Sequence, residues 1–240
     1  MQRDYDIIVW GATGFTGKLV TRYMEQNYTQ GNLKWAVAGR NKSKLNSLGL
    51  SEENILIADS DDQESIDQLV QKTRVILTAV GPYARYGSGL VAACAKHGTH
   101  YCDLTGEVYW MRRMIEEYSS MAKDSGAKIV HTCGFDSIPS DLGTYFLQQA
   151  MMERFGVPAN HVKYRSVAFK GGFSGGTADS MMAMMENAER DPVVLEIGKD
   201  PYALNFTSRG PDSNDLDTAF YDEDFDAWIA PFIMAQINTR

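Results

Sequence analysis

The first 135 residues alternate short apolar runs with segments of helical periodicity. The apolar runs are nearly uninterrupted and rich in Ile and Val, which is typical of strands buried on both faces of a parallel sheet. They predict six strands, at residues 6–10, 33–38, 54–58, 74–80, 99–102 and 128–132. Because helical segments separate these strands, the pattern predicts an α/β fold with a Rossmann-type doubly wound parallel sheet over residues 1–138.

Two of the intervening segments, 15–28 and 108–122, have clear helical spacing. In the first of them, Phe15, Leu19 and Tyr23 form one apolar stripe with the adjacent Val20 and Met24. Such a stripe is typical of the face that a surface helix buries.

The rhythm changes after residue 134. A helix is predicted at 141–155, and the alternating run at 161–170 predicts a half-exposed strand. A glycine cluster and a second helix, 177–190, follow, and the irregular pattern from 198 onward predicts solvated loop. We expect residues 139–240 to form part of a second α/β (α+β) domain for substrate binding or dimerisation. Its apolar last residues carry no stop signal, which suggests that the domain is incomplete at the C-terminus.

Composition narrows the class of protein. The 240 residues are 44% hydrophobic and 22% charged, as in an ordinary soluble globular protein. The net charge of −8, without a long basic cluster, argues against a nucleic-acid surface. No apolar run approaches the ~20 residues of a membrane span, and the start has no signal-peptide pattern. We expect a cytoplasmic protein without an integral membrane segment, and peripheral association with lipid membranes or droplets stays open.

The three cysteines and four histidines have no metal-ligand spacing. We therefore predict no metal site and three reduced thiols.

A glycine-rich loop between the first strand and the first helix is the main candidate for chemistry. Gly11 would permit a tight turn, Gly14 would let a pyrophosphate approach the backbone, and Gly17 would let the helix pack closely. The helix N-terminus favours anions, and two threonines can add hydroxyl donors. The loop predicts a dinucleotide site made of Gly11, Thr13, Gly14, Phe15, Thr16 and Gly17. The alternative is a tight turn without a ligand.

The end of the second strand bears on which dinucleotide binds. NAD sites usually place a carboxylate there to accept from the ribose 2′-hydroxyl, whereas this chain has Arg40, Asn41 and Lys42. Arg40 can donate two parallel hydrogen bonds to a 2′-phosphate, and Lys42 can add a second positive charge beside it. We therefore predict NADP (NADPH) in preference to NAD. Asp59, after the third strand, is placed to meet the adenine end, unless this region only caps the next helix.

Loops after the fourth, fifth and sixth strands should meet at the same edge of the sheet, where ligands of open α/β sheets bind. Val80, Gly81 and Pro82 would place backbone near the nicotinamide ribose. Three side chains are candidates for a catalytic proton donor by position alone, namely Tyr83, Asp103 and Asp136. The alternatives are plain turns and helix caps.

Six motifs together resemble the saccharopine dehydrogenase-like oxidoreductase family, which includes trans-acting enoyl reductases. They are GATGFTG (11–17), VAGRNKSKL (37–45), AVGPYARYG (79–87), YCDLTGE (101–107), CGFDSIPSDLG (133–143) and GGTADS (175–180). The resemblance implies a Rossmann domain and a second domain that binds substrate and often pairs subunits. It also implies that full-length relatives extend well past residue 240.

One departure bears on the substrate. Saccharopine-forming reductases of this family carry a segment like GLDPG after the sixth strand, whereas residues 134–139 read GFDSIP. The resemblance therefore favours an NADP-dependent enoyl or carbonyl reductase of lipid or glycolipid metabolism, with a small-molecule substrate and a homodimeric state. Two alternatives stay open, namely a non-catalytic dinucleotide-binding sensor or scaffold, and a saccharopine-forming reductase of lysine metabolism.

Overall fold

A computed structural model describes residues 3–28, 30–168, 170–172, 174–211, 216–232 and 234–239. Eight strands are described, namely β1 (Tyr5–Trp10), β2 (Trp35–Gly39), β3 (Ile55–Ile57), β4 (Thr73–Thr78), β5 (His100–Cys102), β6 (Ile129–Val130), β7 (Phe220–Asp222) and β8 (Ala227–Ile229). The helices of the first half are α1 (Phe15–Tyr28), α2 (Lys42–Asn46), α3 (Gln63–Val70), α4 (Tyr83–Tyr86), α5 (Ser88–His97) and α6 (Val108–Ser125). Those of the second half are α7 (Ile138–Phe155), α8 (Gly175–Arg190), α9 (Val193–Lys199) and α10 (Ala235–Asn238).

Six strands form one parallel sheet in the order β3-β2-β1-β4-β5-β6. The order reverses between β1 and β4, so the loops that follow these two strands diverge and leave room for a ligand between them. All six strands lie where the apolar runs predict them, within two residues at either end. The Rossmann-type α/β fold class is confirmed.

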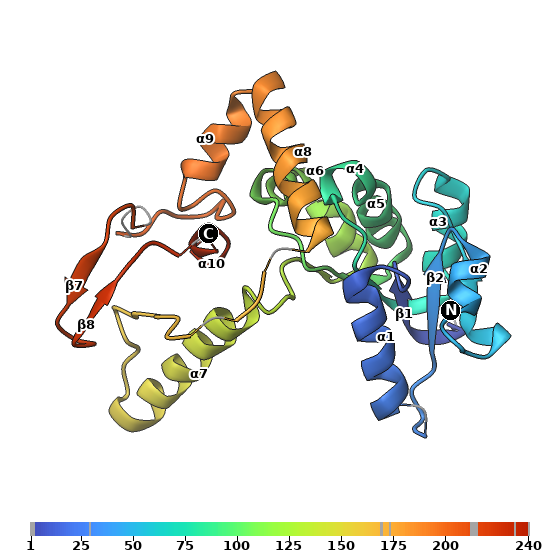
Figure 1. Cartoon of the computed structure of the whole chain (residues 1–240), viewed down its shortest axis with the longest axis horizontal. Helices are drawn as coiled ribbons and strands as arrows, with labels where there is room; N and C mark the ends of the chain where they lie inside the picture. Colours follow the sequence, from blue (N-terminus) through green and yellow to red (C-terminus); the bar gives the residue numbers. More distant parts are fainter. Residues whose placement is uncertain are drawn as a thin grey trace.

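Helices cover the sheet on both faces (Figure 1). The larger core lies under α3, α5 and α6, and the smaller core lies under α1 and α2. Because the sheet is buried on both faces, its strands appear in the sequence as continuous apolar runs.

Only part of the predicted stripe of α1 faces the sheet, namely Met24, which is buried, and Val20, which packs against the smaller core. Phe15 is 74% exposed, and Leu19 and Tyr23 are also exposed, whereas the buried residues of the helix are Gly17, Thr21 and Met24. The helix must bring Gly17 against the loop after β1, and this requirement turns Phe15, Leu19 and Tyr23 outward. Close backbone packing at one glycine therefore decides the orientation of the helix over its apolar periodicity.

The strand predicted at 161–170 is wrong, since residues 161–168 and 170 have no regular secondary structure and Phe169 lies outside the described residues. The alternating polar side chains of this segment make contacts with another element instead. Lys163 and Arg165, two residues apart, both bind Asp222 of β7, at 3.4 Å and 2.7 Å. The prediction of loop after 198 is also wrong in part, because β7 and β8 pair as an antiparallel hairpin.

The helices of the second half differ in how they meet the sheet domain. Three side chains of α8 make polar contacts with it, through Ser180, Glu186 and Asn187. In contrast, α7 extends away from the sheet and buries none of its residues (Figure 1). Within the described residues, no helix combines the length and the apolar character needed to cross a bilayer. The domain boundary at 138/139, at the start of α7, stays a prediction.

Candidate functional site

The glycine loop lies directly after β1 and is held by backbone contacts. Gly11 has φ +84°, a left-handed value that favours glycine, and its N–H donates to Ala38 O of β2 at 3.0 Å. A Cβ on Gly11 would lie 2.6 Å from Val80 Cγ2. Strand β2 and the loops after β1 and β4 therefore meet at Gly11.

The other two glycines differ in the space around them. A Cβ on Gly17 would lie 2.0 Å from Gly11 O, so the close approach of α1 to the loop requires glycine there. A Cβ on Gly14 would meet only Gly11 O, at 3.4 Å, and Gly14 is exposed. The space outside Gly14 is open, and a side chain there would fill it.

The N-terminus of α1 suits an anion. Its first turn carries no acidic side chain. In the described part of the chain, no acceptor receives the backbone N–H groups of Phe15, Thr16 and Gly17. These donors, the helix dipole and the half-exposed Thr13 and Thr16 fit a phosphate group.

The three residues after β2 have different environments. Arg40 is exposed, and within the described ranges its guanidinium has no hydrogen-bond or ion-pair partner. Lys42 forms an exposed ion pair with Glu52 at 3.6 Å. Asn41 caps α2, because its side chain accepts from Lys44 N at 2.9 Å. Arg40 is therefore the cation in this loop that is free to meet a ligand.

Asp59 lies after β3 and is half-buried. Its Oδ1 accepts from Asp61 N at 3.2 Å, and its backbone N–H donates to Ser65 Oγ at 3.1 Å. The cap of α3 is Asp62, which accepts from the N–H groups of Glu64 and Ser65. Asp59 is therefore not the helix cap.

The loop after β4 is fixed by a carboxylate from the loop after β5. Glu107 is buried, and its two oxygens accept from the N–H groups of Tyr83 and Ala84 at 2.8 Å and 2.9 Å. Its Oε1 also accepts from the Ser180 hydroxyl of α8 at 2.9 Å. The segment Val80–Gly81–Pro82 leads directly into this contact, so Glu107 holds the loop after β4 and α8 together.

Tyr83 is buried between the sheet and α6. Its hydroxyl donates to Thr78 O at 3.3 Å and accepts from Leu104 N at 3.4 Å, and its ring packs on Trp110 at 5.6 Å. Burial, reinforced by the charge of Asp103, holds the pKa of Tyr83 well above its usual range. The phenol therefore stays protonated at any physiological pH.

Asp103 is 2% exposed and accepts four hydrogen bonds. The donors are Tyr101 OH at 2.8 Å, Thr105 N and Thr132 N at 3.0 Å, and His131 Nδ1 at 2.7 Å. Both carboxylate oxygens are occupied within the domain. The geometry makes Asp103 the centre of a network that joins the ends of β5 and β6.

Asp136 lies between β6 and α7 and is half-buried. A Cβ on Gly134 would lie 2.7 Å from Asp136 Oδ1 and 3.2 Å from Leu104 Cβ, which places the carboxyl beside the loop after β5. Burial raises the pKa of Asp136. Among the three candidates for a proton donor, it is the one whose carboxyl or hydroxyl has no hydrogen bond to another residue within the described part of the chain.

Sequence reasoning underestimated Glu107, Ser180 and His131. Glu107 and Ser180 are 73 residues apart, and their contact depends on where α8 docks. His131 is paired with Asp103, which lies 28 positions earlier, directly after the neighbouring strand β5. The only sequence signal for either contact is that each residue lies inside or beside one of the six motifs.

Comparison with known proteins identifies the relatives of the chain. Residues 7–130 match the family model described as the saccharopine dehydrogenase NADP binding domain. A Mycobacterium tuberculosis protein provisionally named a trans-acting enoyl reductase is 41% identical, over 99% of this chain and 60% of its own length. The trans-acting enoyl reductase of Mycobacterium ulcerans is 40% identical, over 85% of this chain and 50% of its own length. The chain thus spans about half to 60% of the length of these curated relatives.

Among solved structures, saccharopine dehydrogenase from Saccharomyces cerevisiae matches with a TM-score of 0.45 and 16% identity, over 63% of this chain and 32% of that chain. The family-model match covers more than half of the chain and coincides with the six-stranded sheet. The chain therefore belongs to the saccharopine dehydrogenase-like family, contains that family's NADP-binding domain, and has homologues named trans-acting enoyl reductases.

Proposed function

We propose that this chain is the cofactor-binding part of an NADPH-dependent reductase that acts on an enoyl or carbonyl compound of lipid or glycolipid metabolism. The names of the mycobacterial relatives support the reaction class. The observation that carries the proposal is the pairing of the open, unhindered Gly14 at the start of α1 with the unpartnered Arg40 on the adjacent loop.

Arg40 is proposed to select NADPH over NADH. The 2′-phosphate carries close to two negative charges near pH 7, and a guanidinium can contact it through two parallel hydrogen bonds. A charge-assisted contact is worth about 1.5–3 kcal/mol, and each 1.4 kcal/mol is tenfold in affinity. NADPH should therefore bind roughly ten- to hundredfold more tightly than NADH.

The remaining predicted contacts keep the roles that the sequence suggested. The backbone and hydroxyls of the glycine loop would hold the pyrophosphate, Lys42 would assist at the 2′-phosphate, and Asp59 would meet the adenine end. Val80, Gly81 and Pro82 would line the nicotinamide ribose. Bound NADPH would supply the hydride.

Asp136 is our proposed proton donor among the three candidates. Its raised pKa keeps a larger fraction of the carboxyl protonated near neutral pH than an ordinary aspartic acid would have. Tyr83 holds its proton too tightly, and Asp103 is occupied by four donors. We therefore propose that Tyr83 shapes the site and that Asp103 positions His131.

A second function, a dinucleotide-binding sensor or scaffold without turnover, is favoured by this same occupation of Tyr83 and Asp103 inside the fold. It predicts cofactor binding without substrate-dependent oxidation of NADPH. The third alternative, a saccharopine-forming reductase, requires glutamate and a semialdehyde to drive turnover.

Cofactor choice is tested by four dissociation constants, for NADPH and NADH with the wild type and Arg40→Asp, at one salt concentration. We expect the wild type to prefer NADPH and the variant to prefer NADH, because aspartate repels the phosphate and accepts from the ribose hydroxyl. Lys44→Asp makes the same charge change on α2 and should keep the NADPH preference. Equal wild-type affinities would remove the basis for the choice of NADP.

Turnover is tested by NADPH oxidation against panels of enoyl, carbonyl and imine compounds. With an active substrate, Asp136→Asn should lower kcat about 100-fold or more, while the dissociation constant for NADPH stays within twofold. Retained kcat would exclude Asp136 as the donor. Tight NADPH binding without oxidation by any panel would favour the sensor function.

We further propose a cytoplasmic location and a homodimer, with residues 139–240 forming the partner-binding or substrate-binding part. Exposed apolar side chains on α7 and on the methionine-rich stretch of α8 support pairing there, including Tyr145, Phe146, Phe155, Met182 and Met185. Light scattering of the full-length protein would test this, and a strictly monomeric mass would rule it out.

A further inference from the structure

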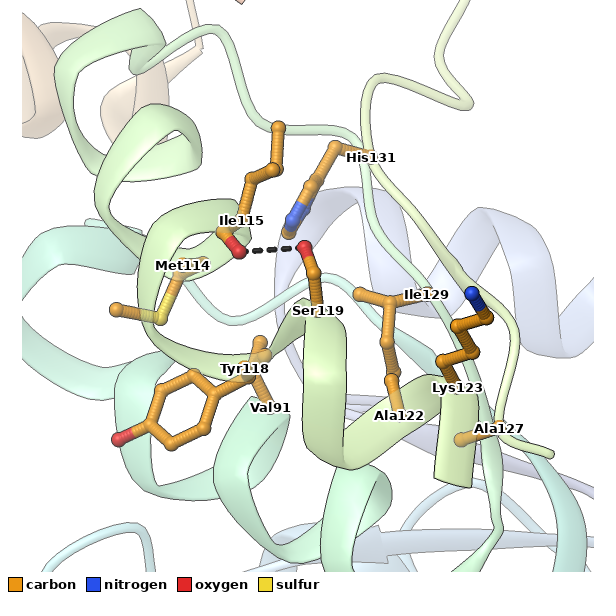
Figure 2. Close-up of a pocket in the computed structure, with 10 residues that line it drawn as sticks. All are labelled: Val91, Met114, Ile115, Tyr118, Ser119, Ala122, Lys123, Ala127, Ile129 and His131. Carbon is orange, nitrogen blue, oxygen red and sulfur yellow. Dashed lines mark hydrogen bonds between the residues drawn. The ribbon is translucent and has the colours of Figure 1, made fainter. Parts of the chain in front are cut away.

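A pocket of about 270 Å³ lies between α6 and the edge strand β6, with Val91 of α5 at one side (Figure 2). Its apolar lining includes Met114 and Ile115 of α6 and Ile129 of β6. In the sheet order, β6 is three strands from β1, which corresponds to about 14 Å at the usual ~4.8 Å spacing of strands. The pocket is therefore separate from the glycine loop.

His131 is the polar group buried in this lining. Its side chain is 9% exposed, and the imidazole points from the end of β6 toward Ile115 and Ser119 of α6 (Figure 2). The imidazole and the Trp110 ring form a T-shaped pair whose ring centroids are 5.2 Å apart. In the part of the chain that the structure describes, Nε2 has no hydrogen-bond partner, although it is buried. The Ser119 hydroxyl is unavailable to it, because that hydroxyl donates to Ile115 O.

The network around Asp103 determines what Nε2 can bind. Asp103 already accepts from Tyr101 OH and from two backbone N–H groups, so it meets His131 as an acceptor. The imidazole must then carry its proton on Nδ1, which donates to Asp103 at 2.7 Å. In the neutral ring this leaves Nε2 as a bare acceptor, and a buried acceptor without a donor costs free energy.

We propose that this pocket is a binding site for a small apolar molecule with one O–H or N–H donor, which donates to His131 Nε2. An apolar cavity of about 150 Å³ holds benzene, so 270 Å³ has room for two fused rings or a short aliphatic chain. The apolar body would pack against Met114, Ile115 and Ile129, and the donor would satisfy the imidazole. The assignment does not depend on the proposed reductase activity.

The test uses 2-naphthol and 2-methoxynaphthalene, which have the same ring system but differ in the hydrogen-bond donor. Calorimetric titration of the wild-type chain should show saturable binding of 2-naphthol, at least tenfold tighter than that of 2-methoxynaphthalene. In a sample with ¹⁵N-labelled histidine, 2-naphthol should shift the Nε2 resonance of His131 and leave that of His161 unchanged.

Two variants separate the hydrogen bond from the pocket. His131→Leu should bind the two compounds with equal affinity, because the acceptor is gone. Ala127→Phe, which adds a ring to the pocket lining without touching Asp103, should abolish binding of 2-naphthol while His131 stays bonded to Asp103. Failure of both compounds to saturate in the wild type, as for a site filled by water only, would overturn the proposal. Equal wild-type affinities would overturn it too.

Discussion

At the scale of single residues, Gly14 and Gly17 show why the spacing of the loop is informative. Gly17 is required by the fold, because a Cβ there would overlap Gly11 O. Gly14 is not required by the fold, because its surroundings are open. Gly14, which the fold does not need, lies at a helix N-terminus with free N–H groups, and this is the basis of our proposal that a ligand approaches the backbone there.

Gly14→Val and Gly17→Val should therefore fail in different ways. We expect Gly14→Val to lose measurable NADPH binding but to keep its free energy of unfolding within about 1 kcal/mol, since only a helix-start position changes. Gly17→Val should lose about 3 kcal/mol or more, because the side chain must displace backbone. Urea unfolding and NADPH titration of both variants measure the two effects. Equal loss of stability in the two variants would contradict this division.

At the scale of elements, buried carboxylates at the ends of strands organise the loops. Glu107 joins the start of α4 to α8, and Asp103 joins the ends of β5 and β6. Each carboxylate accepts hydrogen bonds from segments far apart in the sequence. The edge of the sheet that carries the candidate site is thus held by two polar centres, in addition to the apolar core beneath it.

Glu107 and Ser180 should show coupled contributions to stability. Glu107→Gln places an amide N–H against donors, so we expect the free energy of unfolding to fall by about 1–3 kcal/mol. Ser180→Ala should cost less, and its effect should largely vanish in the Glu107→Gln background. A double-mutant cycle by urea unfolding measures the coupling. The Asp179→Asn variant on the same helix serves as the control, and additive effects of the pair would argue against the shared contact.

The limits of sequence-based reasoning follow from the same elements. Strand positions, the turn at Gly11 and the close packing at Gly17 are local properties, so the apolar runs and glycine spacing predict them. The orientation of α1, the hydrogen bond between Glu107 and Ser180, and the lack of pairing at 161–168 depend on contacts across the fold. Periodicity cannot distinguish a stripe that packs from a stripe that another constraint turns outward.

At the scale of the whole molecule, the hairpin β7–β8 is tied to a segment almost 60 residues earlier by ion pairs. Asp222 is buried and binds Lys163 and Arg165, and Arg165 lies over the Phe225 ring at 5.4 Å. The hydrogen bond from Arg165 lowers the pKa of Asp222 below its usual range. The segment at 161–168 is therefore held by ion pairs to one carboxylate, and not by the backbone hydrogen bonds of the strand that the sequence pattern predicts.

The stabilisation that the ion pairs of Asp222 give to the folded state should be lost in acid. Because the folded-state pKa is lowered, the stabilisation is complete above the unfolded value of about 3.9 and is lost as the pH falls through the lower folded value. The gap in urea midpoint between the wild type and Asp222→Asn should be constant from pH 5 to 7 and should shrink below about pH 4. Glu223→Gln in the same hairpin should show no such gap. A gap that persists unchanged at pH 3 would exclude Asp222 as the origin.

The shared oxygen of Glu107 has a consequence for how ligands would act at a distance. Glu107 Oε1 receives both the Tyr83 N–H and the Ser180 hydroxyl, so a shift of either donor changes the geometry offered to the other. A cofactor that orders the loop at residues 80–82 would then change the equilibrium by which α8 packs on the sheet domain. Thermodynamic reciprocity requires that a molecule bound to α8 changes the affinity for the cofactor by the same factor. One carboxylate oxygen would thus couple ligand binding in the first half of the chain to ligand binding in the second.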